Sequence, residues 1–377
     1  MINILYYKGY TQYHNIGDQL INKSLLDHFR RHADVLISDD KMPEFYLESL
    51  GASKAECVTQ LNQGFHKALI IDSIKSCFDN NRKVYFLASP PGHQFENSFV
   101  TGCKYIISGF FYLFLYLLGV RIIKIGFSIG PLSRMGKIGE WFRALFIKNY
   151  YVRDSISLDF VHSIGIKKAS IFPDLCWSYT PKLNQKVDSE NVLIDKRRKI
   201  ILSFRSAVHG EVKSDSYSQS LLKLLEVLIE KFEEDFVFEI AYQVASDFEF
   251  SEQLYKHFEG RNVVHFNKQQ IDLSNASYYY SGDYVLTNRL HVALLAYKFN
   301  CLPAIVTDMQ QHAKINGIFS DAGIGELLID TNQLTELALS QIEQVLHSKI
   351  SIMDKFTNVE QSYRKSSDEV MKYIFSV

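Results

Sequence analysis

Short apolar runs alternate with amphipathic stretches along the chain, and this alternation predicts repeated β–α units built around parallel sheets. In the first half, the predicted strands are Ile2–Tyr6, Val35–Ser38, Val84–Ala88, Arg121–Gly126 and Tyr150–Arg153, and the predicted helices are Asp18–His32 and Asp154–Ser163. In the second half, the predicted strands are Lys199–Phe204, Phe236–Ala241, Val263–Phe266, Tyr284–Leu286 and Ala304–Val306. The helices predicted there are Leu221–Phe232, Asp247–Phe258, Asn288–Phe299, Thr331–Ser348 and a tail from Met353 to Phe375.

The hydrophobic period is lost between Pro181 and Lys199, where the sequence becomes polar and charged. We therefore predict two Rossmann-like α/β domains, at residues 1–182 and 199–350, joined by a linker at 183–198. Residues 351–377 are predicted to form a C-terminal helix that packs back on the first domain. Open α/β sheets bind ligands at the carboxyl ends of their strands. We therefore expect two parallel sheets facing a cleft, with the functional residues directly after strands.

Composition narrows the class of protein. Basic and acidic residues number 41 and 42, which argues against a nucleic-acid partner held by a bulk positive field. The five cysteines are scattered, without a CxxC pair or a zinc-ligand spacing, so we expect reduced thiols and no metal site. Residues Met1–Tyr7 read as a strand and lack the basic flank of a signal peptide, which favours a cytoplasmic protein.

One segment, between Lys104 and Arg121, contains no charged residue, and Phe110–Leu118 is continuously aromatic or aliphatic. A membrane-spanning helix needs about 20 apolar residues, and this run falls short of that length. We favour a buried helix over residues 105–120. The alternative is a peripheral contact with the inner face of the cell membrane.

The strongest chemical candidate follows the predicted strand Tyr284–Leu286. Thr287 is placed to cap a helix whose first turn carries Arg289 and His291. The apolar residues that follow recur at helical spacing and should face the sheet, so Arg289 and His291 lie on either side of a buried stripe. Free amide groups, the helix dipole and Arg289 together predict a site for a phosphate or a carboxylate.

Weaker candidates also follow strands. Asn15, Gly17 and Asp18 stand at a helix start, where Gly17 permits a tight backbone and Asp18 either caps the helix or accepts a bond from a substrate hydroxyl. Arg153 and Arg205 follow strands in positions suited to an anion; for Arg153 the alternative is a local salt bridge. The chain has neither a P-loop nor a GxGxxG fingerprint, so nucleotide binding through those motifs is not supported.

In their order and spacing, the sequence motifs of this chain resemble those of the polysaccharide pyruvyl transferase family. The matching stretches are Asn15–Asp18, Gly126–Pro131, Val152–Asp154, Pro173-Asp174, Ile201–Arg205, Arg289–His291, Pro303 and Lys314. The resemblance extends from residue 1 to about residue 325 and implies a two-domain fold of the GT-B type. Two turns depart from the family pattern, Ser89–Gly92 and the longer Asp308–Lys314, and both bear on which donor and acceptor are bound.

The resemblance also implies a reaction. The family moves the enolpyruvyl carbons of phosphoenolpyruvate onto a sugar of a surface polysaccharide or exopolysaccharide precursor, as a ketal. By position, Arg289 would hold phosphoenolpyruvate, His291 would be the general acid, and Asp18 would orient or deprotonate a sugar hydroxyl. The further substrate contacts would be Asn15, Gly17, Arg153, Arg205, Asn288 and Lys314. The first domain would take the acceptor, free or lipid-linked, and the second the donor, with no cofactor.

Two other functions stay open on the sequence alone. A nucleotide-sugar glycosyltransferase of the same fold would also use a cleft, phosphate contacts at helix starts and an arginine. The second alternative is a non-catalytic component of a glycan assembly complex, which the altered turn at Ser89–Gly92 permits. The acceptor sugar, the ketal stereochemistry and the oligomeric state are not fixed by the sequence.

Overall fold

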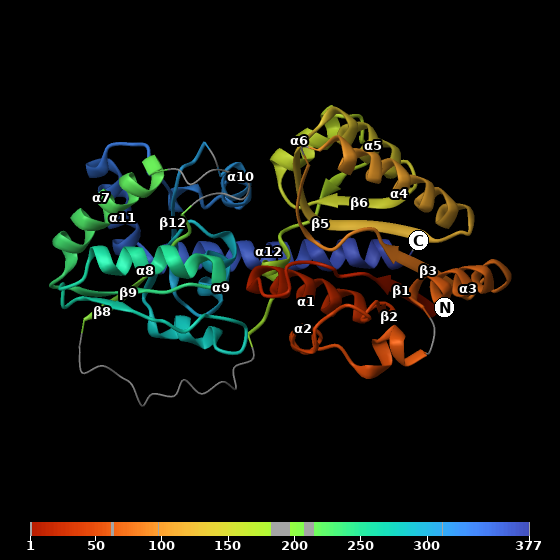
Figure 1. The fold of residues 1–377 in the computed structure, drawn as a ribbon, viewed down its shortest axis with the longest axis horizontal. Coiled ribbons are helices and arrows are strands. Elements are labelled where there is room, and N and C mark those ends of the chain that lie inside the picture. The colour runs from red at the N-terminus through yellow and green to blue at the C-terminus, as the bar shows by residue number, and fades with distance from the viewer. Residues whose placement is uncertain are drawn as a thin grey trace. The chain divides into compact units, whose positions relative to one another are not determined.

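The computed structural model describes residues 2–61, 64–96, 98–181, 197–206, 215–310 and 312–376. The chain forms two compact units, which are drawn in Figure 1. Unit 1 contains Met1–Tyr13, Asp18–Ser178 and Ser362–Val377, and unit 2 contains His14–Gly17 and Tyr179–Gln361. Each unit has its own parallel sheet, as the alternating pattern predicts.

The bounds of the units differ from the predicted domain bounds. The short segment His14–Gly17 groups with unit 2, although it follows the first strand of unit 1. The C-terminal helix is divided between the units at Ser362, because its two halves bury different sets of apolar residues. Most of the predicted linker, residues 183–196, lies outside the described residues, and Arg198 at its end already begins a strand.

The sheet of unit 1 has the strand order β2-β1-β3-β5-β6-β7, with β4 paired to the second half of β5, and all pairs are parallel. Its strands are β1 (Ile2–Tyr7), β2 (Asp34–Ile37), β3 (Arg82–Leu87), β4 (Gly92–Glu96), β5 (Arg121–Leu132), β6 (Ile147–Val152) and β7 (Ser170–Ile171). Because β1 lies between β2 and β3, the winding of the sheet reverses beside β1. The loop after β1 therefore stands at a switch point, where open sheets bind ligands.

The α-helices between the described strands of unit 1 are α1 (Ile16–Arg30), α2 (Glu44–Ser49), α3 (Phe65–Phe78), α4 (Phe99–Leu117), α5 (Arg134–Ala144) and α6 (Ser155–Ser163). Helices α4, α5 and α6 lie together on one side of strands β5 and β6 (Figure 1). They share with α3 a core that includes Tyr6, Phe86 and Ile122 from alternate strand positions. Helix α6 begins at the predicted cap, since the Asp154 carboxylate accepts a bond from the Ser157 amide at 2.7 Å.

The glycines of β5 serve packing. Gly126 and Gly130 have φ values of +76° and +111°, which residues with a β-carbon rarely adopt. The space that a β-carbon would need is filled by the side chains of Leu175 at Gly126 and Phe160 at Gly130. The close neighbours of both glycines are therefore side chains of unit 1 itself.

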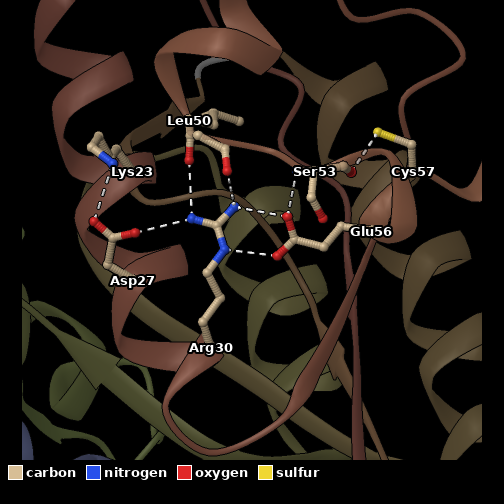
Figure 2. Close-up of polar contacts among 8 residues, drawn as sticks. Lys23, Asp27, Arg30, Leu50, Ser53, Glu56 and Cys57 are labelled. Carbon is tan, nitrogen blue, oxygen red and sulfur yellow. Dashed lines mark hydrogen bonds and ion pairs between the residues drawn. The ribbon is translucent and has the colours of Figure 1, made fainter.

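Arg30, at the end of α1, fixes the segment that follows α2 (Figure 2). Its Nε and Nη2 donate to the two carboxylate oxygens of Glu56 at 2.7 and 3.1 Å, and its Nη1 donates to Asp27 and to the Leu50 carbonyl, both at 3.0 Å. Burial would raise the pKa of Glu56, but the hydrogen bonds from Arg30 and Ser53 outweigh it and lower that pKa. The ionised pair therefore anchors this segment to α1.

The sheet of unit 2 has the strand order β10-β9-β8-β11-β12-β13, again parallel throughout. Its strands are β8 (Arg198–Ser203), β9 (Phe236–Ile240), β10 (Val264–Phe266), β11 (Tyr284–Thr287), β12 (Leu302–Thr307) and β13 (Leu328–Asp330). Its α-helices are α7 (Asp215–Phe232), α8 (Phe248–His257), α9 (Leu290–Lys298), α10 (Ala313–Asp321) and α11 (Thr335–His347). Every residue of β11 and β12 is buried, as expected of central strands covered on both faces.

Short 3-10 helices complete the described structure: η1 (Lys54–Glu56), η2 (Val58–Leu61), η3 (Leu175–Ser178), η5 (Ala245–Asp247), η6 (Ala276–Ser281) and η7 (Gly325–Leu327). The last helix, α12 (Lys349–Ser376), confirms the predicted helical tail. Its first half packs Phe356 on Tyr297 within unit 2, with the ring centroids 4.5 Å apart. Its second half packs Phe375 on Tyr85 within unit 1, with the centroids 4.7 Å apart.

Helix α4 is not the buried helix that we favoured from the sequence. By length and apolar composition it could cross a membrane, but only 22% of that apolar window is buried in the protein. One side carries Gly102, Gly109, Tyr112 and Leu115 and packs inward, whereas residues such as Leu117, 72% exposed, lie on the outside. The prediction failed because an apolar helix at the rim of a unit covers the core with one side only.

Candidate functional site

The predicted residues of unit 2 gather at the carboxyl ends of three neighbouring strands. Strand β11 pairs with β8 on one side and with β12 on the other, and Thr287 is in register with Ser203 and Ile305. The winding of the sheet reverses between β8 and β11, since β8 is followed along the chain by β9 on its other side. This gap is the switch point at which open sheets of this kind bind ligands.

Asn288 joins the ends of β8 and β11. Its Oδ1 accepts a bond from the backbone amide of Arg205 at 3.0 Å, and its Nδ2 donates to the Arg205 carbonyl at 2.8 Å and to the Tyr217 hydroxyl at 2.9 Å. The side chain is fully buried. The family resemblance marks Asn288 as a substrate contact. In the structure its side-chain amide instead fixes the backbone of Arg205.

Arg289 stands at the start of α9. It is the N-cap residue, so the prediction that Thr287 caps this helix was wrong. The Thr287 Oγ1 instead accepts a bond from the Arg289 amide at 3.0 Å, in the turn before the helix. One Nη of Arg289 is bonded to Asp247. Its Nε is buried and makes no hydrogen bond among the described residues. Arg289 is thus held in place by one carboxylate, and its Nε is a donor that no described residue uses.

His291 is the second residue of α9 and lies against Gly17, in the first turn of α1. A β-carbon on Gly17 would overlap the Nδ1 atom of His291 and would lie 2.9 Å from its Cε1. The φ angle of Gly17 is ordinary, so the glycine is needed for this contact and not for a tight turn. Asn15 shapes the same segment, since its Oδ1 accepts a bond from the Gly17 amide at 3.0 Å.

Arg205 is positioned by a histidine that we did not predict as a site residue. Its Nη2 lies 3.0 Å from Nε2 of His312, and Nδ1 of His312 is bonded to the Thr307 hydroxyl. A guanidinium only donates, so Nε2 must be the acceptor and the ring proton must be on Nδ1. Burial, and then the charge of Arg205, lower the pKa of His312 to about 3, which keeps this acceptor neutral.

Lys314 follows in the first turns of α10, two residues after His312. Its charge, like those of Arg205 and Arg289, lowers the pKa of His312, whereas Asp308 raises it. The strand ends therefore carry three cations, and Asp247 and Asp308 are their acidic neighbours, with Asp247 already paired to Arg289. Together with the N-terminal ends of α9 and α10, this arrangement suits a multiply charged anion.

The remaining two predicted residues belong to unit 1. Asp18 lies in the first turn of α1, and its Oδ2 accepts bonds from the Thr11 hydroxyl and, at 3.2 Å, from the Gln12 amide. The carboxylate therefore fixes the loop that follows β1.

Arg153 is completely buried in unit 1. Its Nη1 donates to Asp174 at 2.9 Å, and its Nε donates to Ser128 at 2.7 Å. Asp174 is also completely buried. This geometry is that of the local salt bridge, the alternative that we raised for Arg153, and an ion pair between buried partners leaves no carboxylate or guanidinium charge uncompensated.

The structure thus brings Asn15, Gly17, Arg205, Asn288, Arg289, His291 and Lys314 together within unit 2. Sequence reasoning missed the residues that hold them: Asp247, Thr307, His312 and Tyr217. For His312 a signal existed, because it lies in the Asp308–Lys314 segment that departs from the family pattern. For Asp247 and Tyr217 no local signal existed, since each meets its partner through the fold alone.

Comparison with known proteins identifies the family and the fold of the chain. Residues 15–306 match the family model of the polysaccharide pyruvyl transferases. No curated protein sequence matches the chain. Among solved structures, the chain is similar to UDP-GlcNAc 2-epimerase from Neisseria meningitidis, with 12% identity, 99% of both chains covered and a TM-score of 0.57. A glycosyltransferase from Rickettsia africae is similar at 10% identity, with 99% and 98% covered and a TM-score of 0.56. These likenesses show a GT-B-like pair of parallel-sheet α/β domains.

Proposed function

Because the chain belongs to the polysaccharide pyruvyl transferase family, we propose that it transfers the pyruvyl group of phosphoenolpyruvate to a sugar of a surface polysaccharide or exopolysaccharide precursor, as a cyclic ketal. The observation that carries the donor assignment is the cluster of Arg205, Arg289 and Lys314 at adjacent strand ends, with His291 in the helix that begins after Arg289. Phosphoenolpyruvate is a small trianion, and a cationic cluster with a neighbouring proton donor fits its needs.

The reaction requires one proton at carbon and two new carbon–oxygen bonds. Protonation of the methylene carbon of phosphoenolpyruvate makes a methyl group and leaves an oxocarbenium-like centre at the neighbouring carbon. One sugar hydroxyl adds there. The bond between this carbon and the phosphate oxygen breaks, phosphate leaves with its electron pair, and a second hydroxyl closes the ring. Of the two hydroxyl protons released, one balances the proton placed on carbon and the other leaves with phosphate.

Named residues of unit 2 supply these needs. Arg289 binds the phosphate or carboxylate through the donor that Asp247 does not use. Arg205, held by the neutral ring of His312 and by Asn288, is the second anion contact. His291 gives the proton, and a bound trianion favours its charged form. For the acceptor we propose Asp18 as the hydroxyl contact. We also propose that the reaction takes place in the cytoplasm, with no added cofactor.

The test is mass spectrometry of a lipid-linked or nucleotide-linked glycan incubated with the protein and phosphoenolpyruvate. A gain equal to a pyruvyl ketal, with release of inorganic phosphate, is the expected result. His291→Ala should abolish this gain while leaving donor binding largely intact. Turnover near the wild-type rate in that variant would exclude His291 as the proton donor.

One alternative has an observation in its favour. The compared Neisseria epimerase was solved with UDP-GlcNAc, and a Staphylococcus aureus structure that covers 94% of this chain at a TM-score of 0.54 was solved with UDP. A nucleotide-sugar glycosyltransferase is therefore the second candidate. Thermal stabilisation separates the two, because a protein is stabilised by the ligand that it binds in the folded state. A shift with phosphoenolpyruvate and none with UDP is expected; the reverse favours the glycosyltransferase.

A further inference from the structure

Helix α4 carries an apolar stripe on its outer side. Five apolar residues, spaced three, four or seven positions apart, share this side and are 44–72% exposed: Val100, Ile107, Phe110, Phe114 and Leu117. The opposite side of α4 is fixed inside unit 1, where the Tyr112 hydroxyl donates to the Ala88 carbonyl at 2.8 Å. One side of this helix packs into a core and the other side is apolar and exposed. An exposed apolar side of this kind marks an interaction surface for a partner outside the unit.

Helix α5 lies against α4 and extends this surface. The two backbones approach closely, since a β-carbon on Gly102 would lie 2.7 Å from the Gly136 amide nitrogen. The outer side of α5 mixes apolar and basic residues that recur every three or four positions: Arg134, Lys137, Ile138, Trp141 and Leu145. Ile138, Trp141 and Leu145 are 55, 43 and 50% exposed. We call the two outer stripes together the α4–α5 face.

The exposed charge of this region has one sign. Residues 98–153, both ends included, contain eight basic residues and one acidic residue, Glu140. Glu140 is completely buried and paired with Lys124 and Arg143, so it contributes no negative charge to the surface. Within residues 98–153 the exposed charges are therefore all positive, although the whole chain has a formal net charge of −1.

A cationic pocket opens at the end of α4. It has a volume of about 340 Å³ and is lined by Arg121, Lys148 and Lys168 together with apolar residues that include Tyr116 and Leu145. Partial burial, and then the nearby charge of Arg121, lower the pKa of Lys148. No carboxylate in the described parts of the chain forms an ion pair with these three cations. The pocket therefore joins three cations that no described carboxylate neutralises to the apolar end of α4.

We propose that the α4–α5 face docks on an anionic lipid bilayer, with the apolar stripes in the headgroup region and the cationic pocket on a lipid phosphate. Apolar and aromatic residues interleaved with exposed lysines and arginines are the pattern of interfacial membrane helices. Charge selects this partner, because the exposed charges of the two helices and of the strands joined to them, residues 98–153, are all basic and are complementary to anionic headgroups. The helix lies on the membrane and does not span it, because its inner side is part of the core of unit 1.

Docking is independent of the transferase chemistry, and its test measures binding. The purified full-length protein is floated with vesicles of phosphatidylcholine alone or with phosphatidylglycerol added. We expect recovery with the anionic vesicles only, and loss of that recovery as salt is raised. Each cation removed should lower partitioning roughly fivefold. Equal recovery with both vesicle types, or none with either, overturns the proposal.

Variants locate the contact. Ile107→Glu with Leu117→Glu, and separately Arg134→Glu with Lys137→Glu, should abolish flotation without lowering the melting temperature, because these side chains are outside the core. The matched control, Leu334→Glu with Ile350→Glu, changes apolar residues that are 76 and 81% exposed in unit 2 and should float like the wild type. If the α4–α5 variants instead dissociate a dimer and leave flotation unchanged, the face binds a second copy and the membrane proposal is wrong.

Discussion

The imidazole of His291 lies against the α-carbon of Gly17, in the space that a β-carbon would need. This contact joins the first turn of α9 to the segment His14–Gly17, which belongs to the same unit. The position of the proposed proton donor therefore depends on a residue that carries no side chain.

Gly17→Ala tests this relationship. The added methyl must displace the imidazole, and a general acid displaced by about 1 Å loses on the order of 10²-fold in rate. We expect kcat to fall by about that factor, with the dissociation constant of phosphoenolpyruvate little changed. Gly325→Ala is the control, because a β-carbon there has no described atom within 4 Å and its rate should match the wild type. An unchanged kcat for Gly17→Ala would show that the ring moves at no cost to catalysis.

His312 predicts a pH dependence of stability. Its pKa falls from an ordinary 6.5 to about 3 on folding, so between these values the unfolded chain binds a proton that the folded chain does not. Above about pH 6.5 His312 is neutral in both states, and its contribution to the free energy of unfolding is complete. As the pH falls from 6.5 towards 3, the free energy of unfolding decreases by up to about 1.4 kcal/mol per pH unit. Urea denaturation of wild type and His312→Gln from pH 7 to pH 4 measures this. The variant should lose less stability over that range; parallel curves would exclude His312 as the source.

Asn288 should be required for the stability of unit 2 and for donor binding together. Asn288→Ala removes three hydrogen bonds around the Arg205 backbone and the Tyr217 hydroxyl, and each buried group left unpaired costs about 1–3 kcal/mol. We expect a lower denaturation midpoint and a weaker affinity for phosphoenolpyruvate. Tyr217→Phe is the partial control, since it removes one of the three partners and leaves both bonds to Arg205 in place.

Arg289 and Arg153 should behave differently when truncated. Arg289→Ala removes a proposed anion contact, and a charge-assisted hydrogen bond of about 1.5–3 kcal/mol corresponds to roughly 10–150-fold weaker donor binding. Arg153→Ala leaves the buried Asp174 carboxylate without its cation, which costs about 3–5 kcal/mol of folding free energy. Calorimetric titration with phosphoenolpyruvate and urea denaturation of both variants would separate the two effects. A stable Arg153→Ala protein with weakened donor binding would restore Arg153 as a substrate contact.

The sequence predicts the two sheets well because strand ends are local features. The apolar run at Tyr284–Leu286 ends at Thr287, and the structure places Arg289 and His291 at the following helix start as expected. Helix α5 was not predicted, and its glycines explain why: Gly136 and Gly139 lower helix propensity. They are tolerated because they allow the close approach of α4, which is a tertiary effect.

The supporting residues of the site could not be predicted for a related reason. Asn288 and Arg205 are 83 positions apart and meet because β8 and β11 are neighbours in a sheet whose strand order does not follow the chain. A pattern along the chain identifies which residues follow strands. It does not identify which strands are adjacent, and therefore it could not show that Asn288 braces Arg205 or that His312 receives its hydrogen bond.

Helix α12 has a consequence for the order in which the chain folds during synthesis. The ribosome makes the strands of unit 1 before those of unit 2, but Phe375, which packs on Tyr85 and Phe29 in unit 1, emerges only after every strand of unit 2. Domains usually complete their folding in the order of translation. Here the first unit to appear must wait with part of its apolar surface uncovered until α12, which follows the described strands of unit 2, has been made.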